Sequence, residues 1–181
     1  MRTATLTLEQ FLSTEETKPA REYACGRVFQ KPMPTGPHGS IQAFLAAMLF
    51  PFLARAGIGR VFTELRCVFG PPGRARTYVP DLVVVAREHL PVRRHLMSAP
   101  DLAVEILSPD QHWSHFLDKI QFYLLYGVRL VWVIDPATST ITVEIPGLEA
   151  RILGPGDTLD GGDVLPGFSV AVDEIFAQME D

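Results

Sequence analysis

The sequence predicts an α/β fold, and three observations lead to this prediction. Three apolar runs rich in β-branched residues, at 78–85, 101–107 and 130–136, are typical of strands buried on both faces. The stretch between the last two runs has helical spacing, so we expect a β-α-β unit whose two strands are parallel. A turn at 70–73 leads from an expected strand at 60–69 into the first run, which predicts an antiparallel neighbour for it.

Further elements are expected on both sides of these runs. They are a helix at 5–13, a hairpin at 21–31, a helix at 38–56, a loop at 86–100, a hairpin at 140–153 and a terminal helix at 173–179. Thr7 and Gln10 have the spacing of a capping box in the first helix, and Asp173 has the position of an N-cap in the last. Because the 86–100 loop is long and basic, we expect it to contact substrate or a partner.

The composition predicts one globular domain covering residues 1–181, with hydrophobic residues making up 47% of the chain. We see neither a membrane span of roughly 20 apolar residues nor a signal peptide, so we expect a cytoplasmic protein without membrane contact. The net charge is −5, whereas a protein that coats DNA is usually basic. A local basic face would still permit DNA binding, and its candidates are Arg55, Arg60, Arg66, Arg74, Arg76, Arg87, Arg93 and Arg94.

Two acidic residues interrupt the buried runs. Asp81 lies in the first run and Glu105 in the second, and a carboxylate inside such a strand costs several kcal/mol unless a partner neutralises it. Since side chains alternate along a strand, both carboxylates can face the same side if the two strands pair. A divalent cation would relieve their repulsion, and oxygen ligands favour Mg²⁺ or Mn²⁺ over Zn²⁺.

The helix after Glu105 carries a lysine near its apolar face. The residues that fall on this face at helical spacing are Trp113, Phe116, Leu117, Ile120 and Leu124. Lys119 lies at the edge of this stripe, beside Tyr123. Helical geometry leaves two interpretations open: the ammonium points toward the two carboxylates, or the side chain extends over apolar surface into solvent.

Together these residues resemble a known family. Its signature is carried by Pro80-Asp81, Glu105-Ile106-Leu107-Ser108-Pro109, Lys119 with Tyr123, and Trp132-Val133-Ile134-Asp135-Pro136, which are similar to the Uma2-type endonucleases of the PD-(D/E)XK nuclease-like superfamily. The resemblance implies a restriction-endonuclease-like core, with a mixed central β-sheet flanked by helices. It also implies a metal bound by Asp81, Glu105 and the backbone carbonyl of Ile106. The superfamily lysine normally follows the acid by two residues, where this chain has Leu107, but similar proteins supply it from the next helix, where Lys119 lies.

Three more residues are candidates for the same site. The resemblance implies that Glu22 is a further acid, although by its sequence position it is an ordinary surface glutamate. His38 could contact a phosphate or simply pack or cap its helix. Tyr123 is one helical turn beyond Lys119 and could form a hydrogen bond in the site. A zinc site at Asp110, His112 and His115 is weakly indicated, because their spacing matches no established zinc motif.

The predicted function is hydrolysis of DNA phosphodiester bonds by a metal-dependent endonuclease, which uses Mg²⁺ or Mn²⁺ and acts as a homodimer. Two alternatives remain open. The chain could be an inactive nuclease-like scaffold that serves as a binding or interaction protein, with the buried acids satisfied by Lys119 and hydrogen bonds alone. It could also be a metal-dependent phosphoesterase whose substrate is something other than duplex DNA.

Overall fold

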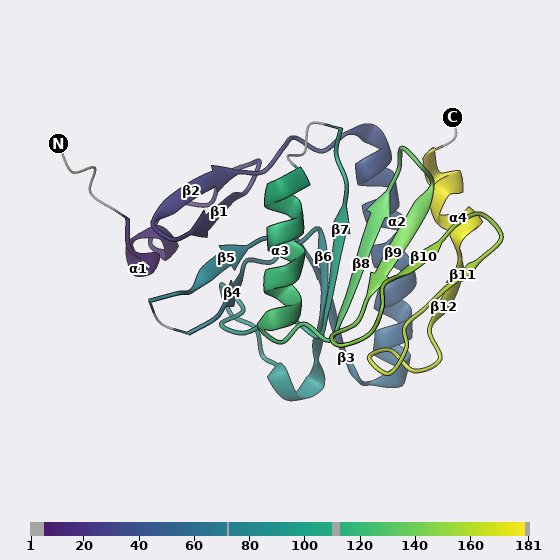
Figure 1. Ribbon diagram of the computed structural model, residues 1–181. Helices are drawn as coiled ribbons and strands as arrows, with labels where there is room; N and C mark the ends of the chain where they lie inside the picture. The colour runs from purple at the N-terminus through teal and green to yellow at the C-terminus, as the bar shows by residue number, and fades with distance from the viewer. Residues whose placement is uncertain (1–5, 72, 110–112, 180–181) are drawn as a thin grey trace.

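The computed structural model describes residues 6–71, 73–109 and 113–179, and a mixed six-stranded sheet lies at its centre (Figure 1). In order across the sheet, its strands are β10 (Arg151–Leu153), β9 (Thr140–Glu144), β8 (Leu130–Asp135), β7 (Leu102–Ile106), β6 (Leu82–Ala86) and β3 (Gly59–Thr63). Strands β7 and β8 are parallel, and every other neighbouring pair is antiparallel. The predicted α/β class, the parallel β-α-β unit and the hairpin at 140–153 are therefore confirmed.

A second, antiparallel sheet lies beside the first. Its order is β2 (Arg27–Gln30), β1 (Arg21–Ala24), β5 (Arg76–Tyr78) and β4 (Cys67–Phe69). The predicted hairpin at 21–31 corresponds to β1 and β2. Its turn places Cys25 and Gly26 at positive φ, which Gly26 adopts without a steric cost.

Two helices cover opposite faces of the six-stranded sheet: α3 (Trp113–Leu125) lies in front of it and α2 (Gly36–Ala56) behind it in Figure 1. Within the described residues, α2 is long and apolar enough to span a membrane, which the sequence analysis did not expect. Its residues Ile41, Leu45 and Leu49 are fully buried in the core between helix and sheet, however. A core helix satisfies the same criterion of length and composition.

The chain passes from the six-stranded to the four-stranded sheet between β3 and β4, and it returns between β5 and β6. Each crossing divides a predicted strand in two. The run at 78–85 is not one strand, because β5 ends at Tyr78 and β6 begins at Leu82 in the other sheet. The run at 60–69 is likewise divided into β3 and β4, with Glu64 at a φ of 49° between them. Pro80 helps to interrupt the first run, since it has no backbone N–H for a sheet hydrogen bond.

The remaining elements are short. They are α1 (Leu8–Leu12), the 3₁₀ turn η1 (Arg87–His89), β11 (Thr158–Asp160) paired with β12 (Ser169–Ala171), α4 (Val172–Phe176) and the 3₁₀ turn η2 (Ala177–Met179). The capping box of Thr7 and Gln10 is confirmed. The N-cap predicted at Asp173 is wrong, because α4 begins at Val172 and the Asp173 carboxylate instead accepts a hydrogen bond from Gly156.

Candidate active site

A pocket of about 830 Å³ opens between the β1–β2 hairpin, the start of α2, the end of β7 and α3. Its lining residues include Lys18, Glu22, Val28, Phe29, Lys31, Met33, His38, Glu64, Asp81, Glu105, Ile106, Phe116 and Lys119. The fold thus brings six of the seven residues proposed from sequence to one pocket. The seventh, Tyr123, contacts Glu105 from α3.

Asp81 lies where the chain passes from β5 to β6, and three groups hold its carboxylate. The Ile106 N–H donates to Oδ2 at 2.7 Å, and the His38 Nε2 lies 3.2 Å from the same oxygen. The Lys31 ammonium donates to Oδ1 at 2.7 Å and also to the Val79 carbonyl. Both oxygens of Asp81 therefore have partners even though the side chain is buried.

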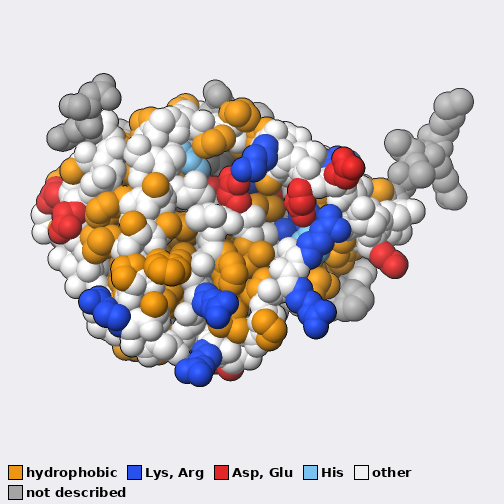
Figure 2. All heavy atoms as spheres, turned by 180° about the vertical axis from the view of Figure 1, so that it is seen from behind, with side chains coloured by type: hydrophobic (Ala, Val, Ile, Leu, Met, Phe, Trp, Pro, Cys, Tyr) orange, Lys and Arg blue, Asp and Glu red, His pale blue; other side chains and the backbone are white. Residues whose placement is uncertain are grey.

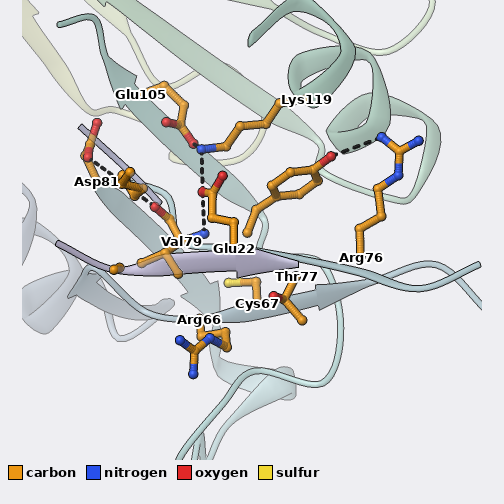
Figure 3. Close-up of polar contacts among 12 residues, drawn as sticks. Glu22, Arg66, Cys67, Arg76, Thr77, Val79, Asp81, Glu105 and Lys119 are labelled. Carbon is orange, nitrogen blue, oxygen red and sulfur yellow. Dashed lines mark hydrogen bonds and ion pairs between the residues drawn. The ribbon is translucent and has the colours of Figure 1, made fainter. Parts of the chain in front are cut away.

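Glu105, Lys119 and Glu22 form a second buried group, and their side chains point toward one another in Figure 3. The Lys119 Nζ lies 2.8 Å from Glu22 Oε1 and 2.9 Å from Glu105 Oε1. Glu105 also accepts the Tyr123 hydroxyl at 2.6 Å, and Glu22 accepts the Val79 N–H at 3.0 Å. One ammonium thus joins two carboxylates that reach the pocket from different sheets.

The two acids of the sequence prediction face the same side of the six-stranded sheet. Asp81 lies two residues before Val83 and Glu105 two residues after Ala103, so each acid shares a strand face with that apolar residue. Val83 and Ala103 both pack in the core on the α3 side. Lys119 is buried on that side too, so it does not extend into solvent. The predicted apolar stripe of the helix needs correction, because Leu117 is exposed and the buried face is centred nearer Lys119.

The charges in the pocket shift one another's pKa values. Burial alone would raise the pKa of Asp81, but the Lys31 ammonium, His38 and the Ile106 N–H lower it well below its ordinary value. Burial raises the pKa of Glu105, and the Asp81 charge adds to this rise while Lys119 opposes it. Burial would lower the pKa of Lys119, yet the carboxylates of Glu105 and Glu22 raise it above its ordinary value. The Tyr123 hydroxyl and the Lys119 ammonium both contact the Glu105 carboxylate, and these two contacts favour its ionised form.

The lowered pKa of Asp81 predicts a pH-dependent contribution to stability. A group whose pKa is lowered by folding stabilises the protein above its unfolded-state pKa, and this contribution is lost as the pH falls through the folded-state pKa. We expect Asp81→Asn to reduce the free energy of unfolding most between pH 5 and 7, and the difference from wild type to shrink below about pH 4. Urea unfolding at pH 7 and pH 3 measures it. A difference that does not change with pH would contradict this account.

The donor set is compatible with a hard divalent cation. The carboxylates of Asp81 and Glu105 and the backbone of Ile106 offer oxygen ligands, and Mg²⁺ often uses only one or two carboxylates together with water. Among the described residues, no three His, Cys, Asp or Glu side chains are grouped to hold a metal ion. A cation at Asp81 would also have to displace Lys31 from Oδ1. The residues therefore fit a cation once this lysine has moved.

Two polar residues that contact Asp81 were not found from the sequence. Lys31 was expected only as the end of the hairpin at 21–31, but its ammonium lies 2.7 Å from Asp81 Oδ1. Gln42 lies on α2, and its amide donates to the Asp81 carbonyl at 2.7 Å. For Lys31 the available signal was its position at the end of the predicted hairpin, whose other strand carries Glu22. Asp110 and His112 lie outside the described residues.

The expected basic face does not surround the pocket. None of the eight candidate arginines lines it, and Arg66 and Arg76 are paired with Glu16 and Asp118. The 86–100 loop does not line it either. Instead, Leu96 of this loop forms backbone hydrogen bonds with Arg66 and Val68 beside the four-stranded sheet. The loop thus packs beside the four-stranded sheet and not at the candidate site, and its contact with a partner stays a prediction.

Comparison with known proteins points to nucleases. A family model described as "Uma2: Putative restriction endonuclease" matches residues 8–173. A solved structure described as "a putative nuclease belonging to DUF820" from Anabaena variabilis ATCC 29413 is 32% identical in sequence, with a TM-score of 0.87 over 96% of this chain and 98% of that one. No curated protein matches the chain. The core implied by the sequence resemblance is confirmed by the family match and this structural similarity.

Proposed function

The chain belongs to the Uma2 family of restriction endonuclease-like proteins, and from this premise we propose that it hydrolyses DNA phosphodiester bonds with Mg²⁺ or Mn²⁺. One observation carries the proposal: Asp81, Glu105 and Lys119 line a single pocket, all three with buried side chains. Burying charges in this way costs stability unless the groups are paired. A functional role explains why the chain keeps them at one pocket.

Asp81 and Glu105 would hold the cation, with the Ile106 carbonyl as a further ligand. When bound, the cation supplies a water of lowered pKa and offsets negative charge on the scissile phosphate. Lys31 must first release Oδ1 of Asp81, because its ammonium already occupies that oxygen at 2.7 Å. Because Lys31 belongs to the pocket lining, its ammonium would then be available to a phosphate oxygen.

Lys119 would act on the attacking water or on the charge that develops at the phosphate. Its ammonium has three N–H donors, and the carboxylates of Glu22 and Glu105 accept two of them. The third can orient the water or stabilise the developing charge. Glu22 and Tyr123 are positioning residues in this proposal, since they fix Lys119 and Glu105, while His38 holds Asp81.

Titration of the protein with MnCl₂ in a calorimeter tests the metal requirement. We expect a saturable heat of binding for the wild type and none for Asp81→Asn, because the substitution removes a charged oxygen ligand. Asp101→Asn is a matched control: Asp101 is also a buried carboxylate, but it contacts Ala86 and His89 outside the pocket. A wild type without binding heat, or heat retained in Asp81→Asn, would contradict the proposed metal site.

An inactive scaffold is the second candidate function, and one observation favours it. Asp81 is paired with Lys31, and Glu22 and Glu105 share Lys119, so each of these buried acids has a lysine partner without a metal. On this hypothesis Mn²⁺ would produce no binding heat and DNA would remain intact. The same titration therefore separates the two candidates.

We further propose that the protein acts as a homodimer in the cytoplasm. Strand β3 is an edge of the six-stranded sheet, and hydrophobic side chains gather over α2 behind that sheet in Figure 2. Phe50 of α2 is exposed. Antiparallel pairing of two β3 strands would continue the sheet from one protomer into its partner. A solution mass near that of one 20.0 kDa chain would contradict the dimer.

A further inference from the structure

We propose that the pocket accepts an unpaired nucleic-acid strand, such as single-stranded DNA or a locally opened duplex, and not an intact double helix. This inference rests on the proposed nuclease function and specifies its substrate. It is carried by three features of the pocket: the depth of the acids, the charge of the lining and the apolar wall beside them.

The reactive groups lie too deep for the surface of a duplex to reach. The exposed fractions of the side chains are 2% for Asp81, 3% for Glu105 and 4% for Lys119. Residues of the β1–β2 hairpin and of the following 31–34 segment line the same pocket. A phosphodiester must therefore enter the pocket to meet these groups. Its volume of about 830 Å³ is that of a site for a small-molecule ligand, which suits one or two nucleotides.

The charge of the lining also disfavours a duplex. The pocket residues include four carboxylates, of Glu22, Glu64, Asp81 and Glu105, and three lysines, Lys18, Lys31 and Lys119, so the lysines are not in excess over the carboxylates. Proteins that bind duplex DNA neutralise several phosphates with Lys and Arg along a continuous surface. On the face shown in Figure 2, Lys and Arg side chains are dispersed among hydrophobic ones and form no continuous band.

An apolar wall forms part of the pocket lining. It consists of Val28 and Phe29 of β2 and Met33 of the segment that follows, and Val28 and Met33 are 41% and 68% exposed. Lys18 and Lys31 lie in the same lining. Proteins that bind single strands combine such apolar and aromatic surfaces, which contact the faces of bases, with a few cations that contact the backbone. Bases offer these faces only where the strand is unpaired or opened.

The experiment compares one labelled oligonucleotide of about 30 nucleotides as a single strand, as a complete duplex and as a duplex with a central unpaired bubble. Cleavage with Mn²⁺ and binding by fluorescence anisotropy are both measured with the full chain. We expect the single strand and the bubble to be cut at least about tenfold faster than the duplex and bound correspondingly more tightly. Equal or faster cutting of the duplex would overturn the inference and leave the nuclease function intact.

Binding distinguishes failure of the inference from failure of the function. Preferential binding of the single strand without any cleavage would support the pocket assignment and overturn the nuclease proposal. Absence of both cleavage and single-strand binding would overturn both.

Two methionines provide matched variants. Met33 and Met97 are 68% and 67% exposed, but only Met33 of the two lines the pocket. We expect Met33→Ser to weaken single-strand binding by about three- to tenfold and Met97→Ser to leave it unchanged. Equal effects of the two substitutions would contradict the assigned wall.

Discussion

Replacing Lys119 with methionine will lower the free energy of unfolding by about 3–5 kcal/mol, the usual cost of removing one partner from a buried ion pair. The ammonium is the shared partner of Glu22 and Glu105, at 2.8 Å and 2.9 Å. Without it, two buried carboxylates face each other with no cation between them. Urea unfolding at pH 7 measures the loss.

Two further variants make this prediction specific. Lys18→Met removes an exposed lysine from the lining of the same pocket, and we expect a change within about 0.5 kcal/mol. Adding Glu22→Gln to Lys119→Met removes one of the stranded charges and should recover part of the lost stability. If Lys119→Met lowers the free energy of unfolding by less than about 1 kcal/mol, or if the double variant recovers none of the loss, the ion pairs of Lys119 with Glu22 and Glu105 do not stabilise the protein as buried pairs.

Asp81→Asn and Glu105→Gln will each reduce metal-dependent cleavage of a single-stranded oligonucleotide by at least about 10²–10³-fold. Each substitution keeps the shape of the side chain and removes a charged ligand from the pocket. The assay measures initial rates at saturating Mn²⁺, with the folded fraction of each variant determined by circular dichroism. Retention of wild-type rates by both variants would eliminate these acids as catalytic residues.

Asp101→Asn is the control that separates catalysis from stability. Asp101 is 4% exposed, so it is buried much like Asp81, and it accepts the Ala86 N–H and contacts His89 away from the pocket. We expect this variant to unfold more easily, because a buried backbone donor loses a charged acceptor. Its cleavage rate per folded molecule should remain that of the wild type.

The sequence predicted those parts of the fold and site that depend on local periodicity. Alternation along the two apolar runs predicted that Asp81 and Glu105 share one face if their strands pair, and the pairing of β6 with β7 meets that condition. The helix after Glu105 and its position before a parallel strand followed from the helical spacing of its apolar residues. The burial of Lys119 was left open, since helical angle alone does not say what faces the edge of a stripe.

The parts that were missed depend on contacts between distant segments. Lys31 meets Asp81 across 50 residues and was not expected there, while Glu22, a candidate only through the family resemblance, meets Lys119 across 97. No local pattern fixes such pairings, because they follow from how the β1–β2 hairpin packs against the other sheet. The division of the 78–85 run was also missed. Its apolar composition suits both of the sheets that the chain joins, and Pro80 was the one local sign of the break.

A crystal soaked in MnCl₂ tests most directly whether Asp81 and Glu105 hold a cation together. We expect an anomalous-scattering peak bonded to an oxygen of each carboxylate, with the Lys31 ammonium moved away from Asp81 Oδ1, where it now lies at 2.7 Å. Lys31 still bound to Asp81, with no peak at the two acids in millimolar Mn²⁺, would contradict the metal site.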